Sequence, residues 1–299
     1  MNKAQPSQQH PSYRGSIHVE EARILCHEAH AGGQYILRLE SPRCAANAEA
    51  GSFSHIQCSG QLPMRRPLSI MRTNKEAGWV EYLYRDVGTG THALAQRQVG
   101  EYLSVMGPIG RPFSASTGKR RPLLIGGGVG IPPMIFLAET LKQKGGLPLV
   151  LMGSEIAFPF ATAHSRIELA GLPAAATAAI VQLEEIGVAS RLASLQDFAG
   201  CFRGYVTDLA RRYLETLTAT ELAEVELFAC GPHPMLAASA KLAREFSLDC
   251  QLSLEEYMAC AVGGCAGCVV KVHTDNGPAM KRVCVDGPVF DANQVFPAD

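Results

Sequence analysis

The sequence predicts a multidomain β plus α/β protein: a small antiparallel β-barrel, a doubly wound parallel sheet and a small C-terminal module. In the first third of the chain, short segments of strand character are separated by Gly and Pro, a pattern typical of a small barrel. In the middle, strands alternate with helices, which favours a parallel sheet covered on both faces. Near the C-terminus, cysteines and glycines are grouped, and no long periodic segment is present.

These changes in character divide the chain into four parts. Residues 1–12 are polar, and we expect a flexible tail there. Residues 13–116 form the predicted barrel, with strands at 17–25, 34–39, 53–58, 68–72, 79–85 and 102–105 and a short helix at 91–97. Residues 117–248 form the predicted α/β domain, with strands at 122–125, 147–152, 179–183 and 225–229 and helices at 132–144, 207–217 and 235–246. Residues 249–299 form the C-terminal module.

Charge and composition exclude several classes of function. The formal net charge is -1, with 27 basic and 28 acidic residues, so no electrostatic feature favours nucleic acid or an anionic membrane surface. The N-terminal residues lack the apolar run of a secretory signal. The longest charge-free apolar stretch, residues 122–138, is interrupted by glycines and prolines and suits a strand–loop–helix turn better than a membrane span. We therefore expect a soluble cytoplasmic protein.

Four of the cysteines follow an informative spacing. Cys260, Cys265 and Cys268 read C-x4-C-x2-C, and Cys284 follows after a gap. Plant-type ferredoxins hold a [2Fe–2S] cluster on thiolates with this spacing. Glycines between the cysteines let backbone amides approach the sulfurs, which stabilises a negatively charged cluster. The spacing therefore predicts an iron–sulfur centre on these four residues.

Alternative roles for the four cysteines stay open at this point. A zinc site would more typically show paired C-x2-C motifs or histidines, and four unrelated buried cysteines are a further alternative. A disulfide framework is disfavoured in a cytosolic protein.

A glycine loop joins the first predicted strand of the α/β domain to its first helix. Its glycines are Gly126, Gly127, Gly128 and Gly130. A loop in this context presents backbone amides and a helix N-terminus to a pyrophosphate. Glycines in such turns also serve packing alone, so the loop by itself does not decide between the two roles.

Three short motifs of the predicted barrel carry polar and aromatic residues. They are Arg66, Pro67, Leu68 and Ser69; then Leu83, Tyr84 and Arg85; then Gly90 and Thr91. An arginine followed by a rigid proline and a hydroxyl suits phosphate binding beside a ring. Taken by itself, Arg66 is better interpreted as an ordinary surface arginine before a strand.

Cys230 ends a predicted strand and is followed by Gly231-Pro232 and a helix. Ligands of open α/β sheets bind at the carboxyl ends of the strands, which makes Cys230 a candidate catalytic residue. A small buried hydrophobic residue is the alternative.

Taken in order, these motifs resemble one family. Over residues 13–296 the chain is similar to the electron-transfer subunits of class B, NAD-dependent dihydroorotate dehydrogenase, within the ferredoxin–NADP reductase superfamily. The motifs that carry the resemblance are those given above, together with residues 230–236 and the segment after Cys284, Val285 to Phe290. The order of flavin barrel, NAD domain and C-terminal cluster is more specific than any single motif.

The resemblance implies cofactors, site residues and a partner. It implies FAD on the three barrel motifs, NAD at the glycine loop with Cys230 near the nicotinamide, and a [2Fe–2S] cluster on the four grouped cysteines. It implies an oxidoreductase subunit with NADH-oxidising, diaphorase-type activity. Electrons would pass between NAD(H), FAD, the cluster and an FMN-containing dihydroorotate dehydrogenase catalytic subunit of pyrimidine biosynthesis. A heterotetramer of two subunits of each kind is expected.

Two positions bear on how closely the chain follows this pattern. Ala261 stands where such cluster loops often carry glycine, which puts the loop's approach to the cluster in question. Glu155 follows the second strand of the α/β domain, where a negative charge repels a 2′-phosphate, and this favours NAD over NADP.

Two other functions are compatible with the same motifs. Similar flavin and iron–sulfur subunits occur in hydrogenase, sulfite reductase and ferredoxin:NADP transhydrogenase complexes, and the partner is another chain. A redox sensor that keeps the fold without turnover is a second alternative. It would bind FAD or NAD without oxidising NADH.

Overall fold

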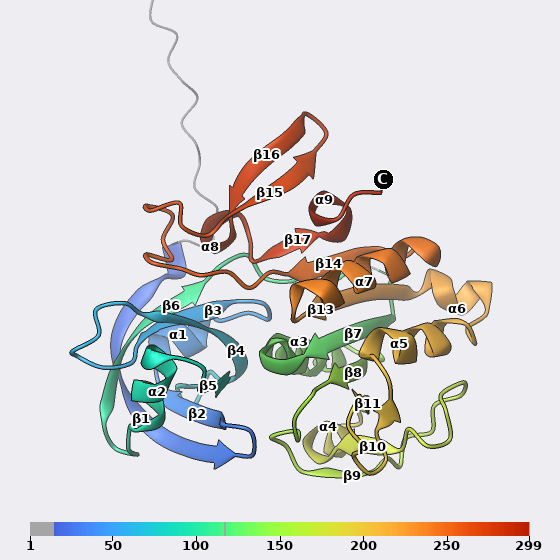
Figure 1. Cartoon of the computed structure of the whole chain (residues 1–299), viewed down its shortest axis with the longest axis horizontal. Helices are drawn as coiled ribbons and strands as arrows, with labels where there is room; N and C mark the ends of the chain where they lie inside the picture. Colours follow the sequence, from blue (N-terminus) through green and yellow to red (C-terminus); the bar gives the residue numbers. More distant parts are fainter. Residues whose placement is uncertain (1–14, 117, 299) are drawn as a thin grey trace, which may run out of the picture.

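The structure is a computed structural model that describes residues 15–116 and 118–298. The predicted tail at 1–12 lies outside the described residues. The first part of the chain is a closed antiparallel barrel with strand order β1-β2-β5-β4-β3-β6 (Figure 1). Its elements are β1 (His18–His30), β2 (Gln34–Glu40), α1 (Pro42–Asn47), β3 (Phe53–Gln57), β4 (Arg66–Asn74), β5 (Trp79–Arg85), α2 (Thr89–Ala95) and β6 (Tyr102–Ile109).

The barrel confirms the six predicted strands. Alternate apolar side chains fill its interior, as the period of a strand requires; Leu37 and Leu39 of β2 are fully buried. The carboxylate of Glu20 on β1 accepts hydrogen bonds from the backbone amides of Arg43 and Cys44, which satisfies the start of α1. The predicted helix at 91–97 begins two residues earlier, at Thr89.

The second part of the chain contains a seven-stranded sheet with strand order β12-β11-β8-β7-β13-β14-β17. All neighbours pair in parallel except β14 and β17. Its elements up to α5 are β7 (Arg121–Gly127), a 3-10 turn (Gly128–Gly130), α3 (Ile131–Gln143), β8 (Leu149–Gly153), β9 (Thr162–His164), β10 (Ala178–Ile180), α4 (Val181–Glu185), β11 (Ala189–Ser194), β12 (Phe202–Arg203) and α5 (Val206–Leu214). The remaining elements are α6 (Ala219–Ala223), β13 (Val225–Cys230), α7 (His233–Glu245), β14 (Cys250–Ser253) and β17 (Val289–Asp291).

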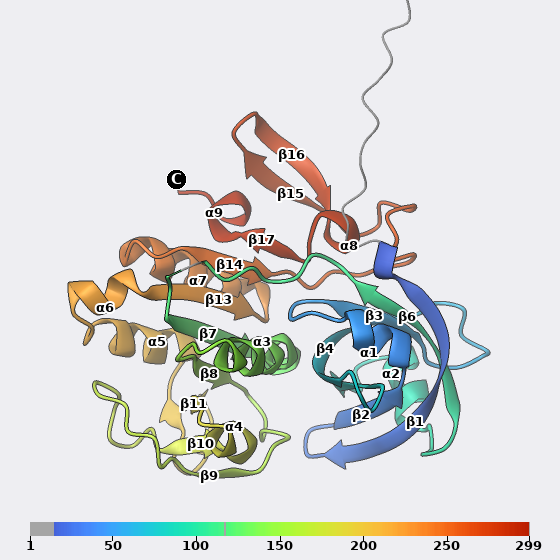
Figure 2. The ribbon, with the colours of Figure 1, turned by 180° about the vertical axis from the view of Figure 1, so that it is seen from behind.

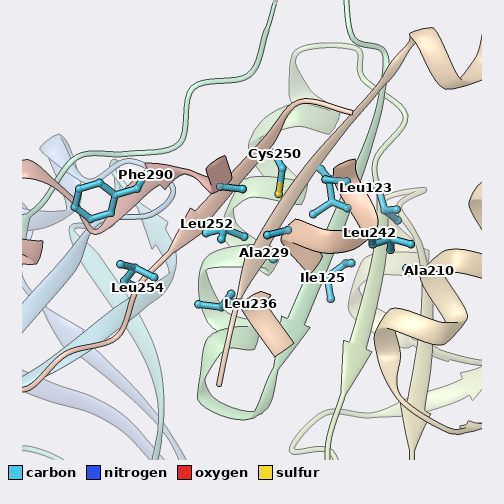
Figure 3. Packing of buried hydrophobic residues seen from close by; sticks show 14 of the residues in the cluster. Leu123, Ile125, Ala210, Ala229, Leu236, Leu242, Cys250, Leu252, Leu254 and Phe290 are labelled. Carbon is cyan, nitrogen blue, oxygen red and sulfur yellow. The ribbon is translucent and has the colours of Figure 1, made fainter. Parts of the chain in front are cut away.

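Both faces of this sheet are covered, which confirms the doubly wound prediction. On β7, Leu123 and Ile125 pack with α5 and α7, whereas Leu124 packs with α3 and α4 on the other face. Strands buried on both faces carry continuous apolar runs, and the apolar run of β7 therefore predicted a strand. Figure 3 shows the first of these cores, where side chains of β7, β13 and β14 gather against Leu236 and Leu242 of α7.

The prediction of a sheet strand at residues 179–183 was wrong. Ala178–Ile180 pairs antiparallel with β9 outside the main sheet, and Val181 begins the short helix α4. The sheet strand is β11, which the sequence pattern did not reveal because polar residues interrupt its apolar run. Those residues are buried and hydrogen-bonded: the Ser190 hydroxyl accepts from the amide of Ile180, and Arg191 donates to the carbonyl of Ile167.

The C-terminal segment returns to the sheet. It contains the hairpin β15 (Val269–Thr274) and β16 (Gly277–Arg282), then α8 (Val283–Asp286), and after β17 the short helix α9 (Ala292–Val295). The hairpin projects away from the rest of the molecule in both views (Figures 1 and 2). β14 and β17 lie beyond the boundary predicted between residues 248 and 249, so the sheet extends into the segment assigned to the C-terminal module.

Several contacts hold the barrel against the sheet. After β6, the backbone of Ser114 exchanges two hydrogen bonds with the side chain of Gln251, which also donates to the buried carboxylate of Glu226. Phe113 packs edge-on against Phe228 of β13. The turn between β1 and β2 reaches the loop after β8, where Gln34 donates to the carbonyl of Ala157 at 2.8 Å.

None of the helices within the described residues has the length and apolar character that a membrane span requires.

His55 on β3 is fully buried between the barrel wall and the segment that precedes the grouped cysteines. Within the described part of the chain, neither of its ring nitrogens makes a hydrogen bond. Burial, aided by the positive charges of Arg65 and Arg66, lowers the pKa of His55 to about 4. The folded protein therefore holds this imidazole neutral.

This histidine predicts a pH-dependent stability. The folded pKa lies below the unfolded value, so the contribution is complete above about pH 6.5 and is lost as the pH falls toward 4. We expect the free energy of unfolding to fall by about 2 kcal/mol between pH 7 and pH 5 on account of His55. Urea titrations of His55→Phe should show a shallower pH slope, and His164→Phe, at an exposed histidine, should keep the original slope. Equal slopes in all three proteins would contradict the assignment.

Candidate functional site

The strand order of the sheet reverses direction between β7 and β13. From β7 the chain proceeds through α3 to β8 on one side, and β13 lies on the other side. The carboxyl ends of β7 and β13 are adjacent, with Gly126 paired to Cys230. Ligands of open α/β sheets bind in the crevice at such a reversal. The structure thus brings the predicted glycine loop and Cys230 together at this point.

The glycines of the loop have different local roles. A Cβ on Gly130 would lie 2.3 Å from the carbonyl oxygen of Cys230, and one on Gly127 would lie 2.6 Å from the sulfur of Met235. Gly130 is required by the close approach of its turn to the backbone of Cys230, whereas the flexible Met235 side chain could move away from a Cβ at Gly127. Packing therefore explains part of the motif. Gly128 has φ +54° and open space around its Cβ position, which leaves its backbone accessible to a ligand.

Cys230 is fully buried, and its thiol lies 3.9 Å from a carboxylate oxygen of Glu255. Burial raises the pKa of the Cys230 thiol well above its usual value, and the charge of Glu255 raises it further. Glu255 as a residue is exposed, but desolvation of its carboxyl group beside the thiol raises the pKa of that carboxyl. A neutral thiol beside a carboxyl group that holds its proton more tightly than usual forms a polar pair at the carboxyl edge of the sheet.

Glu155 lies just beyond the carboxyl end of β8 and is exposed. The loops after β8 and β11 meet there, because the Ser194 hydroxyl donates to the carbonyl of Ser154 at 2.6 Å. Glu155 therefore stands at the same edge of the sheet as the glycine loop, as its predicted role in excluding a 2′-phosphate requires.

The barrel motifs meet where two strands stop pairing. The pairing of β4 with β5 ends at Ile70 and Tyr82, so the first and second motifs lie beyond the end of this ladder. The guanidinium group of Arg66 lies across Gly90, where a Cβ would come within 2.4 Å of its Nε atom. The structure thus brings Arg66 to the third motif, and a side chain at position 90 would collide with it.

The remaining residues of these motifs differ in accessibility. Leu68 and Leu83 are buried in apolar clusters, Pro67 and Ser69 are half-buried, and Arg85 is exposed. Tyr84 is buried, and its ring stacks on that of Tyr35. The Tyr84 hydroxyl and the Nε2 atom of His27 share a hydrogen bond of 2.8 Å. Burial raises the pKa of its hydroxyl. The Thr91 hydroxyl accepts from the amides of Val87 and Gly88 and so shapes the start of α2.

The four grouped cysteines lie in two neighbouring pairs, Cys260 with Cys265 and Cys268 with Cys284. Burial raises the pKa of the Cys260 thiol, but hydrogen bonds from the backbone of Val262 and Cys265 outweigh it and lower that pKa to about 7. Burial and the adjacent Cys268 raise the pKa of Cys284 to about 12.

Backbone amides also approach the sulfurs of this segment. The amide of Gly267 donates to Cys265 Sγ at 3.4 Å, and the amide of Cys284 donates to Cys268 Sγ at 3.5 Å. Such amides stabilise thiolates, and two pairs of thiolates suit two irons. Within residues 15–116 and 118–298, no three His, Cys, Asp or Glu side chains converge to enclose a single metal ion.

Ala261, the position that departs from glycine in the cluster loop, adopts φ +54°, and Ala266 adopts φ +53°. Both are in the left-handed region that favours glycine, so the loop keeps its backbone path at the expense of local strain. Arg282 supports this loop from outside by donating to the carbonyl of Gly263 at 3.0 Å.

Comparison with known proteins agrees with this geometry. The iron–sulfur cluster binding domain of dihydroorotate dehydrogenase B matches residues 255–296. The dihydroorotate dehydrogenase B (NAD(+)) electron transfer subunit of a Geobacillus species is 32% identical over 284 residues, covering 92% of this chain and 98% of that relative. The subunit of the same name from Caldanaerobacter subterraneus is 33% identical over 278 residues, covering 92% and 98%.

The chain belongs to the family of dihydroorotate dehydrogenase B electron transfer subunits. Membership confirms the prediction of electron transfer and of FAD, a [2Fe–2S] cluster and NAD as cofactors, and the iron–sulfur match overturns the zinc alternative for this segment.

Solved structures confirm the fold class. The structure of an NADH-dependent reduced ferredoxin-NADP oxidoreductase superposes with TM-score 0.73 at 26% identity, covering 92% of this chain and 90% of that chain. The ferredoxin reductase of carbazole 1,9a-dioxygenase superposes with TM-score 0.59 at 21% identity, covering 78% of this chain and 67% of that chain.

Sequence reasoning missed Glu255. The signal was present, since Glu255 follows the buried strand Cys250–Ser253 at the sheet edge where ligands bind. That strand itself was not predicted, because its four residues are too short to show a period.

The close approach of the two turns predicts the effect of a single methyl group. Gly130→Ala places a Cβ against the backbone of Cys230, which cannot rotate away, and should destabilise the protein by about 3 kcal/mol. Gly128→Ala meets open space and should cost only about 1 kcal/mol, from its positive φ. Urea unfolding of the two variants measures the difference. Equal losses would show that the turns can separate without cost.

Proposed function

We propose that this chain oxidises or reduces NAD(H) and exchanges electrons with an FMN-containing dihydroorotate dehydrogenase catalytic subunit in pyrimidine biosynthesis. The single observation that carries the proposal is the 92% coverage of the chain, at 32% identity, by a relative named as the electron transfer subunit of that enzyme. We further propose a complex of two subunits of each kind. Location in the cytoplasm is supported by the ten cysteines, all within the described residues, none of which forms a disulfide.

We propose a role for each site residue. The cluster is held by Cys260, Cys265, Cys268 and Cys284, whose sulfurs receive backbone amides. FAD is held by Arg66, Pro67, Leu68, Ser69, Leu83, Tyr84, Arg85, Gly90 and Thr91, which flank the end of the β4–β5 ladder. NAD binds at Gly126, Gly127, Gly128 and Gly130, with Cys230 near the nicotinamide and Glu155 disfavouring a 2′-phosphate.

The residues of this chain orient the cofactors and exclude water from the site. Bound FAD and the cluster supply the conversion between hydride chemistry and single electrons. Arg66 offers a guanidinium group suited to a phosphate, and open space adjoins Gly128 in the loop that would receive the pyrophosphate. The thiol of Cys230 and the carboxyl of Glu255 form a polar edge beside the nicotinamide position, and burial keeps the thiol from ionising. The division into barrel, α/β domain and cluster module corresponds to one cofactor each.

A second candidate function has a specific observation in its favour. The NADH-dependent reduced ferredoxin-NADP oxidoreductase covers 92% of this chain at 26% identity, so a subunit of such a complex has the same architecture. Reconstitution separates the two. Dihydroorotate-dependent reduction of NAD+ by this chain with the catalytic subunit, but by neither alone, supports the first function. Failure of the two chains to form a complex argues against the first function.

The proposed coupling predicts a spectrum. Anaerobically purified protein should absorb at about 450 nm with a broad iron–sulfur shoulder at longer wavelength, and both should bleach when NADH is added. NADH should also drive reduction of an artificial acceptor. A protein that carries both cofactors but does not bleach with NADH would overturn the proposed activity and leave the redox-sensor alternative.

The proposed ligands predict a separation of two activities. Cys268→Ser should lose iron and acid-labile sulfide and abolish electron delivery to the partner, but keep NADH-dependent ferricyanide reduction through FAD, because the flavin motifs are in the barrel. The matched control is Cys250→Ser, a buried cysteine on β14 outside the cluster segment, which should retain the cluster. Full iron content in Cys268→Ser would contradict the ligand assignment.

A further inference from the structure

We propose that the ion pair between Arg72 and Glu139 is an interdomain latch that positions the NAD-binding domain against the flavin barrel for hydride transfer. The inference rests on the proposed oxidation and reduction of NAD(H), and it concerns residues that touch neither cofactor motif. Both are positioning residues rather than catalytic ones.

The latch joins the two elements that carry the cofactor motifs. Arg72 lies on β4, the strand that begins with Arg66, and Glu139 lies on α3, the helix that follows the glycine loop directly. The Nε atom of Arg72 lies 2.6 Å from a carboxylate oxygen of Glu139. One charge-assisted hydrogen bond therefore connects the flavin strand to the NAD helix, and such bonds are short and directional.

A β-bulge aims Arg72 at the helix. Ile70 pairs with Tyr82 and Arg72 pairs with Glu81, so Met71 is an extra residue in β4. Bulges redirect side chains and end regular pairing, and the ladder between β4 and β5 stops at this bulge. Met71 is fully buried in the same apolar cluster as Met134 and Ile135 of α3. The bulge thus places Met71 in the apolar contact between β4 and α3, and Arg72 in the ion pair with Glu139.

The charges around the latch alternate. Arg38 pairs with Glu81 at 2.8 Å, and Glu81 lies 3.7 Å from Arg72, so Arg38, Glu81, Arg72 and Glu139 form a chain from β2 through the barrel wall to α3. The side chain of Arg72 is 13% exposed and that of Glu139 24%. Burial raises the pKa of Glu139, whereas Arg72 opposes that rise. Loss of Arg72 leaves the Glu139 carboxylate without a counter-charge between β4 and α3, whereas loss of Glu139 leaves Arg72 only its longer contact with Glu81, at 3.7 Å. Either change weakens the contact between the two elements.

Hydride transfer is sensitive to the relative position of these two domains. With both cofactors bound, the nicotinamide ring of NADH would transfer a hydride to the isoalloxazine ring of FAD, so that NADH would be oxidised to NAD+ and the flavin reduced by the same two electrons. The reacting atoms must approach to about 3–3.5 Å, and a misplacement of about 1 Å costs on the order of 100-fold in rate. Because the two rings would be carried by different domains, the contact between α3 and β4 helps to set their spacing, together with the other contacts between the barrel and the sheet.

The experiment compares Glu139→Gln with Glu40→Gln in the purified holoprotein. Glu40 forms an exposed ion pair with Arg23 inside the barrel domain and is the matched control. Stopped-flow reduction by NADH and by deuterated NADH should show hydride transfer slowed about tenfold or more in Glu139→Gln, with an increased isotope effect and little change in KM for NADH. Arg72→Lys, which keeps the charge, should be intermediate. FAD and iron content should match those of the parent protein.

Two outcomes overturn the latch: an unchanged hydride-transfer rate in Glu139→Gln, or an equal loss in both glutamine variants. Hydrogen exchange supplies a readout that does not need turnover, since Glu139→Gln should exchange faster along α3 and β4 and Glu40→Gln should not. If the parent protein does not oxidise NADH, the proposed function fails. The exchange result then decides the latch separately, and unchanged protection along α3 would overturn it.

Discussion

The pairing of β14 with β17 is the constraint on which the arrangement of the three sites depends. Ser253 pairs with Val289, and the amide of Leu254 donates to the carbonyl of Pro288, so the whole cluster segment leaves and re-enters the sheet at one point. That point adjoins β13, whose last residue is Cys230. The amide of Arg111, just after the barrel, donates to the carbonyl of Gly287. One antiparallel pair of strands therefore fixes the cysteine loop next to Cys230, at the carboxyl end of β13, and to the barrel exit together.

Much of the fold was predictable because its signals are local. The apolar run of β7, the glycine loop and the prolines at the start of α3 form a continuous strand–turn–helix pattern, and the spacing from Cys260 to Cys268 is read directly. The misses have a common cause. β11 is interrupted by buried polar residues whose partners lie on other segments, and β14 and β17 are too short to show a period. Strands that acquire their stability from tertiary pairing carry little pattern of their own.

The candidate site shows the same division. Residues that present a particular chemistry at a fixed spacing, such as the cysteines and the glycines, could be proposed as site residues from the sequence. Glu255, His55 and the pair of Arg72 with Glu139 were not, because each has meaning only through a neighbour distant in sequence. A carboxyl group beside a buried thiol, or a histidine held neutral between two elements, is a consequence of folding and not of spacing. Glycine motifs also proved to combine two roles, since Gly130 is required by packing against Cys230, whereas Gly128 leaves backbone accessible.

The partly buried ion pair of Arg72 with Glu139 shows how a protein of separate domains can hold its proposed cofactor sites at fixed relative positions. Apolar contacts such as Met71 against α3 supply most of the attraction across the seam, but they are non-directional and permit sliding. A charge-assisted hydrogen bond has a narrow range of distance and angle, so the pair of Arg72 with Glu139 selects one position among those that the apolar seam allows. The cluster segment needs no such device, because both of its ends are paired into the sheet. Directional polar contacts thus occur where the chain connectivity leaves a degree of freedom, and backbone pairing suffices where it does not.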